Sequence, residues 1–483
     1  MNFKLILNIL GFLVFITGIF MMFGIPFSIY YGDNDIGALL QTGIGTSIVG
    51  FSVWFQTRKA DKSDLGKREG YLIVTLGWLA MSAFGAIPFV VYGAIPNYSD
   101  AFFETMSGFT TTGASVLSDI EALPHGLLFW RSFTHLIGGM GIIVLSLAIL
   151  PLLGIGGMQL YAAEVPGITK DKFHPRVKET AKRLWVIYMS FVAVETVLLL
   201  FGGMNLFDAL THSFATMATG GFSPKNNSTA YYNSNPYIQY VLIVFMFLAG
   251  MNFTLHYLAL HKNFSFIKNN GEFKSYLYFT IFVSLFITII HLPYVDFHPE
   301  EAFRQSLFHV VSLITTTGFV SSDYENWAVF SRMIFFILLF VGGCAGSTGG
   351  GIKFIRHLLL FKNGFLELKR LIHPRAVIPT RLNGKAVLPE IISNVQAFFI
   401  LYLFVFVSGA ILLSLMGIDF VSSVGASATC IGNIGPGFGT VGPVANFGHL
   451  PDVAKWLLSF LMLLGRLELF TVLIIFTPYF WKK

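Results

Sequence analysis

The sequence predicts an all-α polytopic membrane protein in which four similar units surround one axis. Its 483 residues have a mean hydropathy of +0.70, and only 12% of them are charged. Soluble domains carry charge on about a quarter of their residues, so the long apolar runs of this chain predict helices that span a membrane. The second observation is a turn of Thr or Ser residues and glycine that recurs along the chain at a nearly constant spacing.

Each copy of this turn follows an apolar segment that is too short to cross a bilayer. The copies occupy residues 110–115, 216–223, 315–323 and, in more divergent form, 433–438. The glycines taken as equivalent are Gly113, Gly220, Gly318 and Gly435, which lie 107, 98 and 117 residues apart. This spacing predicts that each unit consists of a full span, a half-span that ends in the turn, and a second full span.

A pair of helices precedes the four units. We expect one span over residues 5–31 and a second that ends near residue 55, separated by the acidic turn 32–35. The loop that follows is rich in Lys and Arg between residues 58 and 68, and basic residues collect in the cytoplasmic loops of membrane proteins. The N-terminus is therefore expected on the cytoplasmic side.

The boundaries of the units follow from the alternation of apolar runs and basic loops. The predicted division is 1–70 for the N-terminal two-helix extension and basic loop, 71–183 for pore repeat 1, 184–274 for pore repeat 2, 275–388 for pore repeat 3 and 389–483 for pore repeat 4. Full spans are expected at 71–92 and 127–153, 184–202 and 237–260, 275–292 and 328–361, and 389–416 and 453–480. Re-entrant pore helices are expected at 100–112, 207–219, 301–317 and 419–434.

This division predicts about ten full spans and four pore helices in a pseudo-fourfold arrangement, with both termini cytoplasmic. Every inner loop is basic, and the outer connections are poor in Lys and Arg except for Lys225 and Lys455.

The four turns have the chemistry of a cation filter. A short helix that enters from outside points its negative C-terminal end at the bilayer centre, and irregular backbone at that depth must line a water-filled space. Backbone carbonyl groups beside glycine can then replace the water of a cation. One such turn alone would be an ordinary helix end, but four at equivalent places favour a filter. Its expected residues are Thr111, Thr112, Gly113, Thr219, Gly220, Thr316, Thr317, Gly318, Asn433, Ile434 and Gly435.

Further stretches carry a resemblance to a known family. They are residues 138–143, 156–161, 342–351, 366–374 and 465–468. Together with the four turns they resemble the Trk/Ktr/HKT superfamily of K⁺ transporters, and within it the TrkH/TrkG-type bacterial potassium uptake proteins. The resemblance covers essentially the whole chain, including the N-terminal helix pair.

The resemblance implies a multi-pass protein of the bacterial inner membrane that takes up K⁺, and also Rb⁺, bound as a metal ion at the filter residues. It implies a homodimer with one pore per chain. It also implies a cytoplasmic TrkA-type regulatory ring that binds nucleotide, while no organic cofactor is expected on this chain. Each turn has a single filter glycine, so discrimination against Na⁺ should be weaker than in four-subunit K⁺ channels.

A glycine-rich stretch interrupts the apolar segment 328–361, where each glycine costs about 1 kcal/mol of helix propensity. We expect an intramembrane gate loop there, and the resemblance assigns it that role; the alternative is small-residue helix packing. The expected gate residues are Gly342, Gly343, Gly346, Ser347, Thr348, Gly349, Gly350, Gly351 and Arg466. Arg466 lies in the middle of the last span, and Glu468, two positions on, is a poor partner on a helix. We therefore expect Arg466 below the filter near the gate loop.

Functions other than a conducting pore would require other residues. A Na⁺- or H⁺-coupled K⁺ symporter would place ionisable groups within the membrane, and Glu195 is one candidate. An enzyme is not expected, because no paired carboxylates, metal cluster or activated nucleophile is recognisable. Nucleic-acid binding is likewise not expected, because the basic residues belong to inner loops.

Other polar residues are expected to have structural roles. Cys344 and Cys430 suit small-residue packing positions, and His135 and His212 are interpreted as hydrogen-bonded packing residues. Four acids lie near the starts of the pore helices, where they could cap the helix or attract cations at the outer mouth. They are Glu104, Asp208, Glu301 and Asp419.

Overall fold

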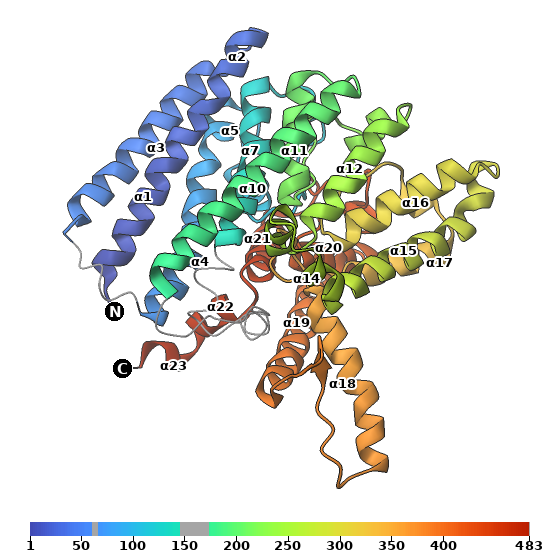
Figure 1. Cartoon of the computed structure of the whole chain (residues 1–483). Helices are drawn as coiled ribbons and strands as arrows, with labels where there is room; N and C mark the ends of the chain where they lie inside the picture. Colours follow the sequence, from blue (N-terminus) through green and yellow to red (C-terminus); the bar gives the residue numbers. More distant parts are fainter. Residues whose placement is uncertain (60–65, 145–172, 483) are drawn as a thin grey trace.

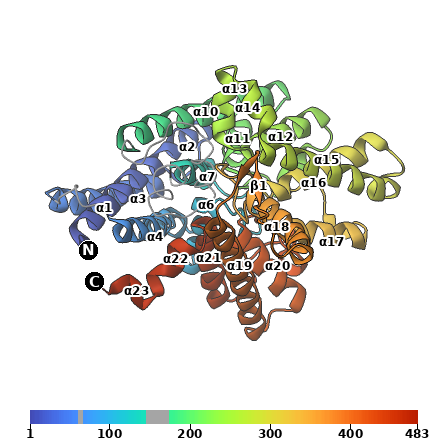
Figure 2. The same ribbon diagram turned by 60° about the horizontal axis from the view of Figure 1, so that its bottom comes forward.

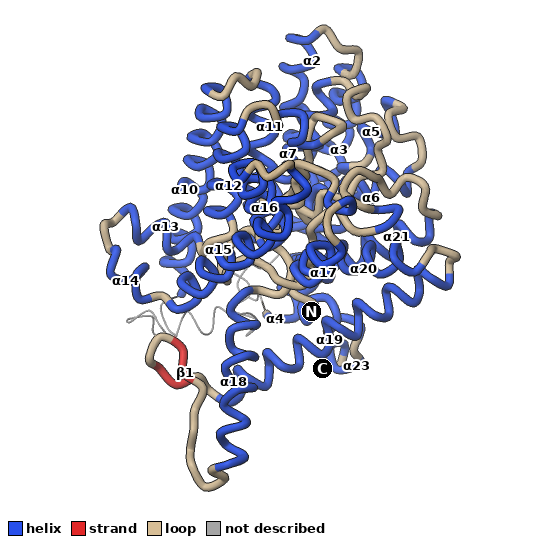
Figure 3. The backbone as a smooth tube through the Cα atoms, turned by 90° about the vertical axis from the view of Figure 1, so that its right-hand side faces the viewer, coloured by secondary structure: helices blue, strands red, loops and turns tan. Residues whose placement is uncertain are grey.

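The computed structural model describes residues 1–59, 66–144 and 173–482, and these form helices joined by loops and one short hairpin (Figure 1, Figure 3). The hairpin pairs β1 (Arg381–Leu382) with β2 (Lys385–Ala386) in antiparallel fashion. The sequence-based prediction of a helical membrane protein is confirmed. The stretch 156–161, which is one of those that carry the family resemblance, lies outside the described residues.

The described helices follow the predicted order along the chain. They are α1 (Phe3–Met21), η1 (Met22–Gly24), α2 (Ile25–Tyr31), α3 (Ile36–Thr57), α4 (Lys67–Gly85), α5 (Ile87–Tyr92), α6 (Tyr98–Phe109), α7 (His125–Val144), α10 (Phe173–Phe201), α11 (Leu206–Ala218), η4 (Ser228–Tyr232), α12 (Pro236–Ala249), α13 (Phe253–Leu260), α14 (Phe264–Asn269), α15 (Gly271–His291), η5 (Leu292–Val295), α16 (Pro299–Ile314), η6 (Tyr324–Asn326), α17 (Val329–Leu338), α18 (Phe354–Ile372), α19 (Pro389–Leu415), α20 (Phe420–Gly432), η7 (Gly439–Val441), α21 (Asp452–Arg466), α22 (Phe470–Leu473), η8 (Ile474–Phe476) and α23 (Pro478–Trp481).

The N-terminal helices α1 and α3 form a closely packed pair at one edge of the molecule (Figure 1). Their contact is made of glycines, as is common where membrane helices approach closely. A Cβ atom on Gly50 would collide with the backbone of Phe15, and one on Gly18 would collide with the carbonyl oxygen of Gly43. These glycines let the two backbones touch.

Six helices of the described part are long and apolar enough to cross a membrane, or eight if each of two bent pairs counts as one span. Three predicted full spans are not single straight helices in the structure. α12 and α13 meet at 100°, and α21 and the segment from Phe470 to Phe476 meet at 112°, so neither 237–260 nor 453–480 is one straight helix. The third, 328–361, is broken between α17 and α18 by irregular chain, as its glycines predicted. The expected end of the span 127–153 lies outside the described residues.

The chain runs around a common centre in sequence order. In Figure 2 the helices α1, α3 and α4 are followed around the centre by α10 to α14, then by α15 to α17, then by α18 to α21. The two termini lie near each other at one end of the molecule, and α18 extends from that same end (Figure 1).

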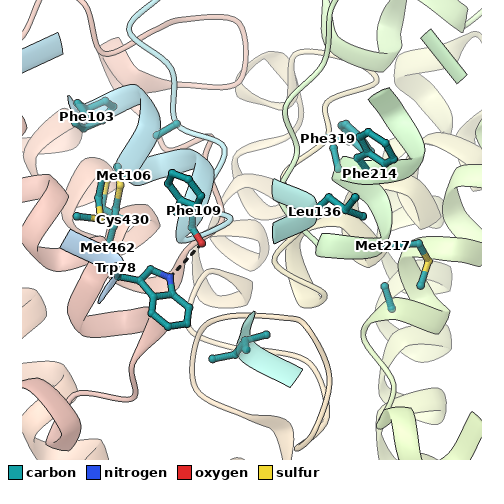
Figure 4. Packing of buried hydrophobic residues seen from close by; sticks show 14 of the residues in the cluster. Trp78, Phe103, Met106, Phe109, Leu136, Phe214, Met217, Phe319, Cys430 and Met462 are labelled. Atoms are coloured by element: carbon teal, nitrogen blue, oxygen red, sulfur yellow. Dashed lines mark hydrogen bonds between the residues drawn. The ribbon is translucent and has the colours of Figure 1, made fainter. Parts of the chain in front are cut away.

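The core lies between the short helices and the long ones that surround them. Trp78 of α4 donates from its indole nitrogen to the carbonyl oxygen of Phe109, at the end of α6, at 3.2 Å (Figure 4). Cys430 is fully buried in the same cluster, and Cys344 is 1% exposed in a neighbouring one. Both thiols are free, which agrees with their expected packing role.

Candidate functional site

Four short helices, α6, α11, α16 and α20, end in turns with the same backbone conformation. At the end of each helix, one residue other than glycine has a left-handed φ: Thr111 at +51°, Thr219 at +54°, Thr316 at +59° and Asn433 at +53°. Two residues later a glycine also has a positive φ: Gly113 at +83°, Gly221 at +79°, Gly318 at +77° and Gly435 at +98°. Left-handed backbone is strained for residues with a Cβ, so four copies of one pattern indicate four equivalent segments.

In the second segment this pattern shifts the equivalent glycine by one position. Gly221 matches Gly113, whereas the predicted Gly220 matches Thr112, Thr317 and Ile434. Sequence reasoning missed Gly221 because either glycine of the pair fits the spacing. The dipeptide Gly221-Phe222, which aligns with Gly318-Phe319, is the signal that could have found it.

The four segments close into a ring through their glycines. A Cβ atom on each glycine would lie within 3.0 Å of a carbonyl oxygen in the next segment, a distance that real Cβ contacts do not show. The glycine–carbonyl contacts are Gly113 to Gly220, Gly221 to Thr317, Gly318 to Ile434 and Gly435 to Thr112. The last contact returns to the first segment, so carbonyl groups of four segments meet in one narrow ring.

Side chains of the turn residues are hydrogen-bonded to one another beside the ring. The hydroxyl groups of Thr110 and Thr112 are 2.8 Å apart, and those of Thr315 and Thr317 are 2.7 Å apart. In the fourth segment Asn433 replaces threonine, and its amide donates to Thr112 Oγ1 at 3.0 Å. The hydroxyl groups of Thr110, Thr112, Thr315 and Thr317 are thus engaged in pairs, whereas Thr111 Oγ1 is buried without a hydrogen-bond partner.

A cavity of about 130 Å³ reaches the ring from one side. Its lining includes the glycines Gly113, Gly221, Gly318 and Gly435. All four segments are therefore open to the same space, as a shared aqueous entrance requires.

The glycine-rich stretch 342–351 forms an irregular loop against the ends of the short helices. The two ends of the loop are joined by a hydrogen bond from Gly342 N to the carbonyl oxygen of Ile352 at 2.9 Å. Gly350 N donates to Thr316 Oγ1 at 2.6 Å, and Thr348 Oγ1 donates to the carbonyl oxygen of Met217 at 3.0 Å. The loop therefore touches the ends of α11 and α16. The Thr348 hydroxyl is used in this contact, whereas Ser347 Oγ is buried without a partner.

The bend between α12 and α13 anchors the other side of the loop. Cys344 N donates to the carbonyl oxygen of Gly250 at 2.8 Å, and Phe253 N donates to that of Gly346 at 3.0 Å. Ala345 N donates to Glu272 Oε1 at 2.7 Å. The bend, which the sequence did not predict, frees backbone groups that hold the loop in place.

Arg466 ends α21 and is 2% exposed. Its guanidinium donates to the carbonyl oxygen of Thr348 in the loop at 2.7 Å and to that of Gly138 in α7 at 3.2 Å. Glu468 pairs instead with Arg356, in agreement with its expected poor fit to Arg466. Arg466 thus bridges the loop and α7.

The acids of the short helices have different partners. Asp419 caps α20 and accepts from Ser422 N at 3.0 Å, as a capping residue should. Glu104 does not cap α6, whose N-cap is Asn97; it is buried and pairs with Arg131 at 2.7 Å.

Lys225 and Lys455, the two basic residues in connections that were expected to be poor in Lys and Arg, each pair with an acidic side chain. Lys225 lies 3.2 Å from Asp208, and Lys455 lies 2.5 Å from Asp100. Pairing with an acid lowers the cost of burying a charged side chain in a membrane protein.

The two histidines are hydrogen-bonded, as expected. His135 Nδ1 donates to the carbonyl oxygen of Gly108 at 2.8 Å, which leaves Nε2 to accept from Phe222 N at 3.2 Å. His212 bonds to the carbonyl oxygen of Asp208 and to Ser223 Oγ. Within the described ranges no group of three or more His, Cys, Asp or Glu side chains is placed to hold a metal ion.

A closed ring of backbone oxygens in a helical membrane protein is typical of proteins that transport cations. A model of the TrkH family, described as cation transport protein, matches residues 36–297 and 285–483. The chain is 41% identical to the Trk system potassium uptake protein TrkH of Escherichia coli (strain K12) over all of both chains. It is 35% identical to TrkG of the same organism, with 99% of each covered.

A solved structure agrees with these matches. The crystal structure of the potassium transporter TrkH from Vibrio parahaemolyticus superposes with a TM-score of 0.91 and 39% identity, over all of both chains. The chain belongs to the TrkH family of cation transport proteins. The resemblance stated from the sequence is confirmed, as is the expectation that the protein is not an enzyme.

Proposed function

We propose that this protein conducts K⁺, and also Rb⁺, across the membrane through the ring of backbone carbonyl groups. The observation that carries the proposal is the closed cycle of glycine–carbonyl contacts between four segments. Such a ring can replace the hydration shell of an ion the size of K⁺. The relatives named as potassium uptake proteins support the choice of ion.

The architecture that fits this function is a set of four membrane-pore-membrane repeats with a pseudo-fourfold axis along the pore. For these repeats we keep the boundaries expected from the sequence, with α6, α11, α16 and α20 as the pore helices. Each of these helices presents its C-terminal end to the ring, where the partial negative charge of the helix favours a cation. Two spans in each repeat, together with α1 and α3, would make ten.

The filter comprises the eleven residues predicted from the sequence together with Gly221. With one positive-φ glycine in each segment, the filter is short and offers few rings of carbonyl oxygens, so its preference for K⁺ over Na⁺ should be modest. The loop 342–351 and Arg466 act as the gate below it. This role is supported by the contacts of the loop with the ends of α11 and α16, and by the bridge that Arg466 forms between the loop and α7.

The assembly follows the sequence-based expectation. The chain forms a homodimer in the bacterial inner membrane, both termini are cytoplasmic, and a TrkA-type nucleotide-binding ring docks from that side. The adjacent termini and the basic α18 at the same end support this orientation (Figure 1).

A Na⁺- or H⁺-coupled symporter is the second candidate. The observation that favours it is Glu195 of α10, a carboxylic acid with 0% exposure in a candidate membrane span. Buried acids within the membrane mark proton or cation relays in many transporters.

Uptake of ⁸⁶Rb⁺ into proteoliposomes loaded with K⁺ tests the filter. Gly113→Ala and Gly318→Ala should abolish uptake, because the new methyl group would displace a carbonyl oxygen of the ring. Gly364→Ala in α18 is the matched control, since a Cβ there meets nothing within 4 Å. Uptake that survives in both ring variants at the control level would overturn the filter assignment.

A further inference from the structure

A buried ion pair joins the first two filter segments on one side of the ring. Arg131 of α7 donates from Nε to Glu104 Oε1 of α6 at 2.7 Å, and the two side chains are 2% and 0% exposed. Removing two charges from water costs free energy that their mutual attraction only partly returns, so such a pair is weak evidence for stability. The further contacts of each side chain indicate a different role.

Glu104 holds the first segment. The hydroxyl group of Ser115 donates to both carboxylate oxygens, at 2.9 and 3.2 Å, and Val116 N donates to Oε2 at 2.8 Å. Ser115 lies two residues beyond the ring glycine Gly113. The carboxylate therefore fixes the backbone where the first segment leaves the ring.

Arg131 holds the second segment. Its NH1 group donates to the carbonyl oxygen of Ser223 at 3.1 Å, and its guanidinium carbon lies 3.5 Å from the ring centroid of Phe222. Ser223 lies two residues beyond Gly221, at the position equivalent to Ser115. A guanidinium over an aromatic face is attracted to it, so the cation contacts the second segment in two ways.

We propose that the Arg131–Glu104 pair positions the first and second filter segments relative to each other and thereby contributes to the selection of K⁺ over Na⁺. The proposal rests on the proposed function of the ring as a filter. Gly113 and the carbonyl oxygen of Gly220 are in close contact between these two segments. A displacement of either segment changes the spacing of the carbonyl oxygens, and that spacing and number decide how well a dehydrated ion is held.

The pair requires the shape of an arginine. Nε bonds the carboxylate while NH1 bonds a carbonyl oxygen of another segment, and the plane of the group stacks on Phe222. The ammonium group of lysine has no such planar fork and does not stack. Arg131→Lys thus keeps the charge and loses the geometry, and Glu104→Gln keeps the shape and loses the charge.

The test measures selectivity rather than uptake alone. The concentrations of Na⁺ and of K⁺ that halve ⁸⁶Rb⁺ uptake into proteoliposomes are determined, and their ratio is compared among variants. Arg131→Lys and Glu104→Gln should each lower the Na⁺-to-K⁺ ratio about tenfold, equivalent to about 1.4 kcal/mol. Arg304→Lys is the matched control, because this arginine of α16 is also paired with a glutamate but bonds Glu300 and Gln239.

A ratio equal to that of the control, with uptake merely reduced, would overturn the positioning role. If Arg131→Lys fails to fold, Phe222→Leu decides the question, because it removes the aromatic side chain that stacks on Arg131 and leaves the Arg131–Glu104 ion pair intact. It should lower the ratio as well, and an unchanged ratio contradicts the proposal. Failure of the filter assignment is distinguishable, because Gly113→Ala would then retain uptake, whereas failure of the positioning role leaves that variant inactive.

Discussion

At the scale of single residues, the site depends on where a side chain is forbidden. The four ring glycines combine a positive φ with a neighbouring carbonyl oxygen that a methyl group would displace. Gly220 differs from them, because its φ is not positive and its nearest neighbour is the imidazole of His135 rather than backbone. The two adjacent glycines of the second segment therefore have unequal roles.

This difference predicts unequal effects of the same substitution. Gly221→Ala should reduce ⁸⁶Rb⁺ uptake by roughly tenfold or more, because the methyl group meets the carbonyl oxygen of Thr317 and the φ is strained. Gly220→Ala should retain more uptake, since a side chain can shift more easily than the ring backbone. Equal loss in the two variants, measured at equal protein content, would contradict the assigned register.

At the scale of elements, broken helices serve the site. α12 bends into α13, α17 stops before the loop 342–351, and α21 ends at Arg466 with left-handed φ angles at Glu468 and Leu469. Each break frees backbone groups or turns a side chain toward the loop. The loop 342–351 is thus held where helices end.

The bridge made by Arg466 predicts a gating effect. Arg466→Gln should raise ⁸⁶Rb⁺ uptake without the regulatory ring by about tenfold, because the positive charge beside the path is removed and the loop loses a strong donor to Thr348. Arg58→Gln, an exposed arginine at the end of α3, should have no effect. Basal uptake of Arg466→Gln at or below the unmodified level would exclude a closing role for this residue.

The N-terminal pair gives a prediction on stability. Gly50→Val should destabilise the protein by about 1–3 kcal/mol, because a Cβ atom at this position collides with the backbone of Phe15 in α1. Gly45→Val on the same helix should be nearly neutral, since a Cβ there meets nothing within 4 Å. The midpoint of thermal unfolding in detergent measures both. An unchanged midpoint for Gly50→Val would mean that α1 and α3 are not packed through their glycines.

At the scale of the whole molecule, the question is whether transport requires a second ion. A conducting pore predicts ⁸⁶Rb⁺ uptake that is driven by the K⁺ gradient alone, at equal pH on both sides and without Na⁺. Glu195→Gln should then keep at least about half of the uptake, because amide and protonated acid have the same shape and neither carries charge. Asp419→Asn at the cap of α20 serves as a control for loss of a carboxylate.

Uptake that begins only when Na⁺ or a proton gradient is supplied would favour the symporter. In that case the Glu195→Gln variant should also lose the dependence of uptake on pH. A coupled mechanism would leave the ring glycines essential, so the two questions are answered separately.

The sequence by itself determined the class of protein, the order of the elements and most of the ring. Apolar runs and basic loops are local properties of the chain, because a bilayer selects for them span by span. The four turns could be found in the same way, since each needs glycine or a short polar residue at the end of a short helix. The glycines at 342–351 likewise predicted a break in the helix, although they did not predict which residues the resulting loop contacts.

The tertiary structure decided what depends on contacts between distant segments. The choice of Gly221 over Gly220, the hydrogen bond of Arg131 to Ser223 and the bridge of Arg466 to the loop all depend on contacts between parts of the chain from different units. Composition and periodicity carry no information on such partners, because a φ angle and a hydrogen bond across segments arise only when the segments meet. The sequence determined which residues could belong to the four turns, and the packing of the turns against one another determined which of their atoms form the ring.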